Sequence, residues 1–132
     1  MDDILVRSRF VAATGVQIED KRPGYARMSL LVRPEHLAAN HQLHGGVLTS
    51  VMDSVLAVAL RELRGRASSL HSSIEMNASF LAPAGEGENV IVEGRITDLQ
   101  DVVAFGEAEA WGEDRGLLAK ARVTFAIQQP RT

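Results

Sequence analysis

The strongest pattern in this chain is a helical one, and it spans about Gly46 to Leu63. Apolar residues recur there around most of the helical circumference: Val47, Leu48, Val51, Met52, Val55, Leu56, Val58, Ala59, Leu60 and Leu63. A helix that is apolar nearly all round is wrapped by other structure and does not lie on a surface. Gly65, just beyond it, suits the position that ends a helix.

The remaining patterned segments alternate between apolar and polar residues, which is typical of strands with one buried face. The clearest case is 117–127, where the odd-numbered residues are apolar and Lys120, Arg122 and Thr124 point the other way. The full set of predicted strands is Val16–Glu19, Tyr25–Val32, Ser69–Leu81, Asn89–Leu99, Val102–Trp111 and Leu117–Ile127. Short turns join the last three, which predicts an antiparallel meander.

The order of these elements predicts the fold class. Residues 2–12 suggest a short N-terminal helix with Ile4, Leu5 and Val11 on its apolar face, and 33–44 form a loop. Two strands, a long buried helix and then further strands predict an α+β fold, with one antiparallel sheet curled around one long central helix. Long strands also leave sheet edges that need cover, which favours a dimer.

The composition fits an ordinary globular protein, because 45% of the 132 residues are hydrophobic and 23% are charged. We therefore expect residues 1–132 to form one domain. The absence of cysteine excludes disulfides, a thiolate nucleophile and sulfur-ligated metal sites. A net charge of -3 and an aromatic content of 5% disfavour a protein that binds nucleic acid.

Neither the apolar runs nor the first residues indicate a membrane protein or an exported one. The longest uninterrupted apolar run, Val55–Leu60, is far shorter than a helix that spans a bilayer. The start, Met1–Ile4, lacks the basic and apolar regions of a secretory signal. We therefore expect a soluble protein of the cytoplasm with no membrane partner.

Two adjacent glycines, Gly45 and Gly46, stand where the long helix begins and follow His44. One interpretation is a tight entry turn. The other is close approach of a ligand, because a residue without Cβ lets an oxygen reach the free N–H groups of the first turn. The helix dipole favours developing negative charge at that point, as an oxyanion hole requires.

Asp53 lies within the helix on its one small polar stripe, beside Thr49, Ser50, Ser54 and Ala57. The stripe either faces water or lies half-buried against other structure. Half-burial of a carboxyl group raises its pKa and makes Asp53 a candidate nucleophile or general base.

His36, His41 and His44 lie within nine residues and raise the question of a metal site. Their spacings match no familiar zinc pattern, and no cysteine supports them. We therefore predict no metal, and the default role for His44 is capping or packing.

Gly45 and Asp53 are eight residues apart, which is about 12 Å of helical rise. A carboxylate that attacks a carbonyl held at the Gly45 N–H must come within about 3–3.5 Å of it. If both residues act on one substrate, Asp53 must therefore come from a second subunit. The sequence thus predicts a homo-oligomer with a shared site.

The run Asn40-His-Gln-Leu-His44-Gly-Gly46, with Asp53 nine residues after His44, resembles the signature of PaaI-like hotdog-fold acyl-CoA thioesterases. The segment Ser73-Ile-Glu-Met-Asn77-Ala-Ser-Phe-Leu-Ala-Pro83 is similar to that family's strand after the central helix. The order of elements also agrees over roughly residues 14–128.

The resemblance implies a thioester hydrolase in which Asp53 is the nucleophile or general base and the Gly45 N–H polarises the carbonyl. It further implies that His44 orients the site near the sulfur and that Ser73 positions water. Three more residues are expected to contact the substrate: Asn40, Gly46 and Ser50. No cofactor is expected, because CoA enters as part of the substrate. A homotetramer built as a dimer of dimers is the expected assembly.

One position departs from the family pattern. Many members carry Asn or Gln six residues before the histidine, where this chain has Ala38, and Asn40 follows two residues later. Either Asn40 takes over the amide role or this helper is absent. Two other functions stay open: a hydratase or dehydratase on the same fold, which needs a second acid–base partner, and a non-catalytic acyl-CoA-binding module.

Overall fold

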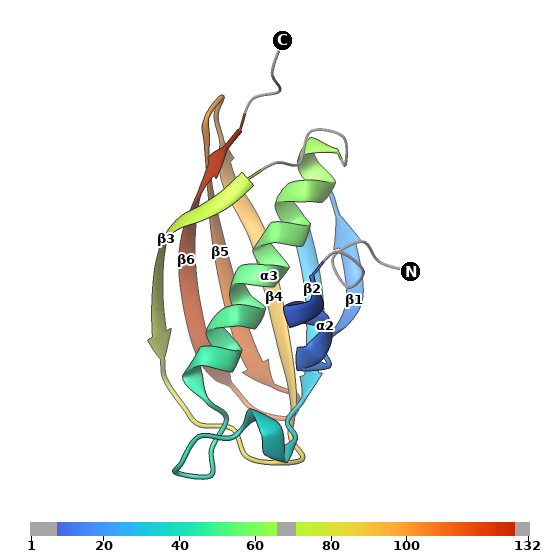
Figure 1. Cartoon of the computed structure of the whole chain (residues 1–132), viewed down its shortest axis with the longest axis vertical. Helices are drawn as coiled ribbons and strands as arrows, with labels where there is room; N and C mark the ends of the chain where they lie inside the picture. The colour runs from blue at the N-terminus through green and yellow to red at the C-terminus, as the bar shows by residue number, and fades with distance from the viewer. Residues whose placement is uncertain (1–7, 66–70, 129–132) are drawn as a thin grey trace.

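The computed structural model describes residues 8–65 and 71–128 (Figure 1). In chain order the elements are α2 (Arg9–Thr14), β1 (Gln17–Arg22), β2 (Tyr25–Leu31), η1 (Pro34–His36), α3 (Gly45–Arg64), β3 (His71–Phe80), β4 (Asn89–Leu99), β5 (Val103–Gly112) and β6 (Leu117–Ile127). In this part of the chain the strands form one antiparallel sheet in the order β1-β2-β4-β5-β6-β3. The sheet curves around α3, which confirms the α+β prediction.

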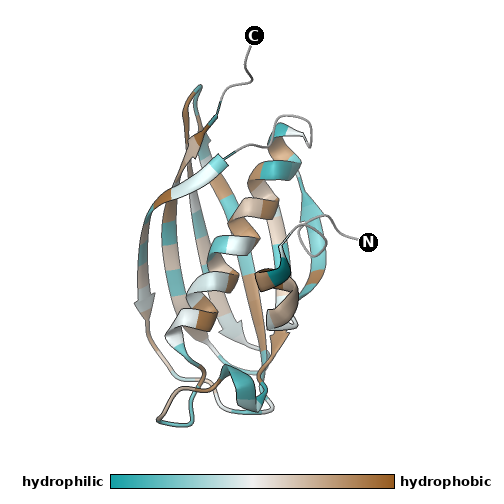
Figure 2. Cartoon of the chain, viewed as in Figure 1, coloured by the Kyte–Doolittle hydropathy of each residue, from teal (hydrophilic) through white to brown (hydrophobic). Residues whose placement is uncertain are grey.

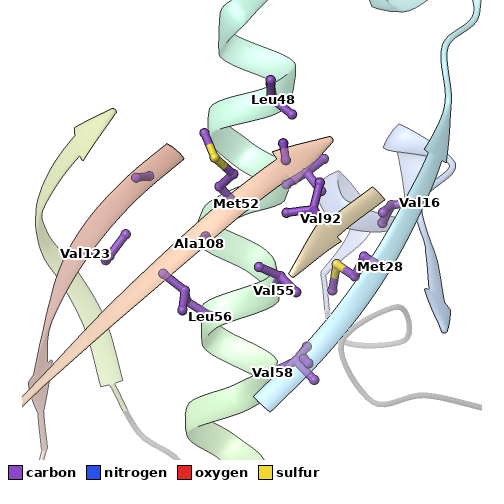
Figure 3. Close-up of a cluster of buried hydrophobic side chains, with 14 of the residues drawn as sticks. Val16, Met28, Leu48, Met52, Val55, Leu56, Val58, Val92, Ala108 and Val123 are labelled. Atoms are coloured by element: carbon purple, nitrogen blue, oxygen red, sulfur yellow. The ribbon is translucent and has the colours of Figure 1, made fainter. Parts of the chain in front are cut away.

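The long helix α3 packs its apolar side into the hollow of this sheet. Its buried apolar residues include Met52, Val55, Leu56 and Leu60, each fully shielded from solvent. Figure 3 shows Met52, Val55 and Leu56 among side chains from the strands. Burial of each such side chain contributes about 1.5–3 kcal/mol. Although α3 is largely apolar, no helix in the described ranges is long and apolar enough to cross a membrane.

Two glycines in the sheet allow α3 to lie close to it. A Cβ added to Gly94 in β4 would lie 2.8 Å from Val55 and 2.9 Å from Leu56. One added to Gly106 in β5 would lie 2.8 Å from Leu56. A larger residue at either position would force the Val55 or Leu56 side chain, or the helix that carries them, to shift.

The N-terminal half departs from the prediction in its boundaries. The first described helix is α2, which begins at Arg9 and not at residue 2, while Ile4 and Leu5 lie outside the described residues. Val11 is buried as expected. Strand β1 continues to Arg22, three residues beyond the predicted end at Glu19, and Arg22 faces Tyr25 across a turn of only two residues.

The meander is confirmed, because β4, β5 and β6 are neighbours in the sheet, and β5 is displaced by one residue from its predicted range. Alternating hydrophilic and hydrophobic residues are visible along these strands (Figure 2). Strand β3 takes the far edge beside β6, where its apolar side is only partly covered. Ile74 is 63% exposed and Phe80 is 51% exposed.

Candidate functional site

The first turn of α3 contains a backbone donor that bonds to no acceptor in the described part of the chain. His44 is the N-cap, and its Nδ1 accepts the Gly46 N–H at 2.8 Å. The Val47 and Leu48 N–H groups donate to the His44 carbonyl at 3.0 and 3.3 Å. Among the described residues the Gly45 N–H has no acceptor, as expected for a donor at the start of a helix. The capping role predicted for His44 is thus confirmed, and the cap leaves Gly45 available.

A pocket of about 300 Å³ opens beside Gly45. Its wall is mainly apolar and comes from α3, from the end of β3 and from the loop that follows β3. Asn40 and Gln42 are its polar side chains. The Asn40 Oδ1 accepts the Gln42 N–H at 3.1 Å, which fixes this loop. The structure therefore brings two predicted site residues, Asn40 and Gly45, to one pocket.

The loop after β3 is tied to the segment before α3 and to the β5–β6 turn. The Leu43 N–H donates to the Ala84 carbonyl at 2.8 Å, so two walls of the pocket are joined directly. Arg115 donates to the Pro83 carbonyl and lies 3.2 Å from the Glu88 carboxylate. Sequence reasoning assigned no function to Arg115, because nothing local links a turn residue to a loop about 30 positions earlier.

Asp53 and Ser73 form the second group. The Ser73 hydroxyl donates to Asp53 Oδ1 at 2.6 Å, a length typical of a hydroxyl bonded to a carboxylate. Asp53 is half-buried on α3, while Ser73 is exposed on β3. Within the described ranges Asp53 Oδ2 has no hydrogen-bond partner, so it is available to water or a substrate. The structure thus brings together Asp53 and Ser73, two predicted catalytic residues that lie on separate elements.

The polar stripe around Asp53 is only partly exposed. Thr49, Ser50 and Ala57 are half-buried, whereas Ser54 is buried and its hydroxyl donates to the Ser50 carbonyl at 2.7 Å. The Ser50 hydroxyl donates to the Gly46 carbonyl at 2.8 Å. The substrate contacts predicted for Ser50 and Gly46 stay predictions. The Ser50 hydroxyl is already bonded to the Gly46 carbonyl, and the Gly46 N–H is bonded to the His44 side chain.

The site residues of one chain form two clusters and not one. Gly45 and Asp53 lie on the same uninterrupted helix, so about 12 Å of rise separates them. Asp53 does not line the pocket beside Gly45. The Gly45 cluster and the Asp53 cluster, which we call the two halves of the site, therefore face different surroundings within a protomer.

The three histidines that are close together in the sequence have different structural roles. His36 is 3% exposed, its Nδ1 accepts the Arg33 N–H at 3.0 Å, and its Nε2 lies 2.7 Å from the Thr14 carbonyl. His41 occupies a left-handed turn with a φ of 65°, and His44 caps α3. In residues 8–65 and 71–128, no group of three or more His, Cys, Asp or Glu side chains could hold a metal ion.

Comparison with known proteins points to one family. Residues 40–119 match the family model of the thioesterase superfamily. A putative esterase of Archaeoglobus fulgidus is 30% identical over 108 residues, which are 82% of this chain and 68% of that protein. Acyl-coenzyme A thioesterase 13 of Homo sapiens is 27% identical over 103 residues, which are 77% of this chain and 72% of that protein.

Solved structures agree with this result. A mutant of the phenylacetic acid degradation protein PaaI from Thermus thermophilus is 26% identical, with a TM-score of 0.83 over 92% of this chain and all of that chain (100%). The conserved protein PA5202 from Pseudomonas aeruginosa, at 22% identity, has a TM-score of 0.89 and covers 97% of this chain and 100% of its own. The expected PaaI-like hotdog fold is thereby confirmed.

Proposed function

This chain belongs to the thioesterase superfamily, and from that membership we propose that it hydrolyses the thioester bond of an acyl-CoA to a carboxylic acid and CoA. The observation that carries the proposal is the Gly45 N–H at the start of α3, which has no acceptor among the described residues. An unpaired donor beside an apolar pocket suits a carbonyl oxygen whose acyl substituent is also apolar.

Gly45 serves as the carbonyl polariser in this proposal. A thioester oxygen that accepts the Gly45 N–H gains negative charge as the tetrahedral intermediate forms. A donor that is already oriented, at the positive end of a helix dipole, stabilises that charge without reorganisation. His44 fixes the first turn and lies near the sulfur, while Asn40, Gly46 and Ser50 contact the substrate.

Asp53 activates the attacking group. As a general base it takes a proton from water, the hydroxide adds to the carbonyl carbon, and the carbon–sulfur bond breaks as the thiolate of CoA leaves and is protonated. As a nucleophile it forms a mixed anhydride with release of CoA, and water then hydrolyses the anhydride. In both cases Ser73 holds Oδ1 and leaves Oδ2 free to react. CoA arrives with the substrate, and the mechanism uses no resident cofactor or metal.

The two halves of the site come from two subunits in this proposal. The rise of about 12 Å between Gly45 and Asp53 is too long for one thioester to contact both on one helix. Strand β3 pairs only with β6 among the described strands, so its outer edge is open to a second copy. We propose a dimer in which Asp53 of one protomer faces Gly45 of its partner, and two such dimers in a tetramer.

The test is incubation of the protein with a panel of acyl-CoA thioesters and a thiol reagent. Release of free CoA from at least one thioester is the expected result. Hydration of an unsaturated acyl group without CoA release would make the protein a hydratase. Binding without either reaction would make it a non-catalytic module.

A further inference from the structure

Phe80 is a large aromatic residue that the core does not use. It ends β3 and is 51% exposed. Its backbone is nevertheless held against β6, because Phe80 pairs with Ala119 and the Leu81 N–H donates to the Leu118 carbonyl at 2.8 Å. The ring therefore projects from a fixed backbone and contributes little to the buried core.

The outer edge of this ring lies over the start of α3. A Cβ added to Gly45 would be 3.4 Å from Cζ of Phe80 and 3.6 and 3.8 Å from its two Cε atoms. Phe80 and Gly45 also line the same pocket of about 300 Å³. The ring thus stands next to the one N–H of the first turn that has no acceptor in the described part of the chain.

A thioester bound at this N–H has two arms, and the apolar part of the pocket suits the acyl arm better than the pantetheine arm. The pantetheine arm carries polar amides and leads to a charged nucleotide. The acyl arm starts one bond from the polarised carbonyl and is largely apolar, like the wall that Phe80, Leu48 and Leu118 provide.

We infer that the Phe80 ring sets the size of the acyl group that this enzyme accepts. This inference rests on the proposed function. Phe80 takes no part in the chemistry and acts through shape, so its replacement changes the ranking of substrates.

The experiment compares kcat/KM for straight-chain acyl-CoA thioesters of increasing length, together with branched and aryl ones. Phe80→Ala enlarges the pocket and is expected to raise the ratio of long or bulky substrates to short ones by about tenfold, the discrimination typical of small changes in an apolar pocket. Phe80→Trp narrows it and is expected to shift the ratio the other way. Because the two changes have opposite signs, the test survives if one variant fails to fold.

Phe105→Ala is the matched control. Phe105 is also aromatic and 40% exposed, but it shares the face of β5 with Glu107, away from the buried Ala104 and Ala108. It is expected to leave the substrate ranking unchanged. Light scattering on each variant reports whether the oligomer is intact.

The outcomes are separable. If wild type releases CoA from the series but Phe80→Ala and Phe80→Trp keep its ranking, the inference is overturned and the proposed function stands. Dissociation of Phe80→Ala with an unchanged ranking also overturns it, since the ring then covers a partner subunit. If wild type hydrolyses no thioester, the proposed function fails and the role of Phe80 fails with it.

Discussion

The start and the middle of α3 both carry site residues, but they are built differently. At the start, the proposed functional group is a backbone N–H, and the N-cap formed by His44 satisfies the neighbouring amides. In the middle, the proposed functional group is the Asp53 side chain, and its partner Ser73 comes from a strand 20 residues later. The first half is thus made by local structure and the second by tertiary contact.

This difference suits the two halves of the site to different chemical roles. A fixed N–H donor stabilises charge that develops on an oxygen, and a carboxylate with one free oxygen activates water or attacks carbon. About 12 Å of helix separates them, so in the proposed mechanism the two groups that act on one thioester come from two chains. The following experiments test each half separately and then their cooperation.

The largest effect is expected from loss of the donor at the helix start. Gly45→Pro removes the N–H and is expected to lower kcat by about 10²–10³-fold, the usual cost of losing one oxyanion-hole donor. Proline suits the first helical position, and the extended backbone of His44, with a ψ of 130°, suits the residue before proline. Steady-state kinetics with an acyl-CoA hydrolysed by wild type measures the change.

Gly45→Ala is the matched control for that variant. It adds a Cβ at ordinary contact distance from Phe80 but keeps the N–H, so it should retain much more activity than Gly45→Pro. Circular dichroism must show the same helix content for both variants. Equal activity of the two would mean that the N–H is not used.

Asp53→Asn tests the other half. The amide has the shape of the carboxyl group but is neither a base nor a nucleophile, so kcat is expected to fall by at least about 10²-fold with little change in substrate binding. Asp98→Asn, which removes an exposed carboxylate on β4, is the control and should keep wild-type kinetics. Activity of Asp53→Asn within a few-fold of wild type would show that Asp53 only faces solvent.

Mixed oligomers test whether the two halves meet across subunits. Gly45→Pro and Asp53→Asn chains are unfolded together and refolded in equal amounts. Random pairing in a two-fold dimer makes about half of the dimers mixed, and one of the two sites in each mixed dimer is intact, so activity should return to about one quarter of wild type. Mass spectrometry must confirm the mixed species. Recovery no greater than the sum of the two variants would reject a shared site.

The smallest effect is expected at Ser73. Ser73→Ala removes one hydrogen bond to Asp53, and the loss of about 1–1.5 kcal/mol corresponds to a decrease of about tenfold in kcat. Ser72→Ala, at the neighbouring exposed position of β3, is the control. A decrease as large as that of Asp53→Asn would mean that Ser73 has a direct chemical role, whereas no decrease would mean that water replaces it fully.

Much of the first half could be predicted from the sequence. The apolar residues of α3 repeat with the helical period and predict the helix. His44 and the two glycines are adjacent in the sequence, and backbone hydrogen bonds at the start of a helix depend on such close neighbours. The predicted helix begins at Gly46, one residue after the observed start at Gly45, and a difference of one residue is usual at a helix end. The position of Asp53 on α3 was also predicted, because it follows from the same period.

The sequence by itself thus determined the central helix, the strands of the β4–β6 meander and the residues at the start of α3, since periodicity and turn chemistry act over short stretches of chain. Only the tertiary structure decided that β3 lies beside β6 and not beside β4, because strand order depends on pairing between distant segments. That choice brings Ser73 to Asp53 and the Phe80 ring over Gly45. These contacts join residues 20 or more positions apart, and no local pattern records which of them will meet.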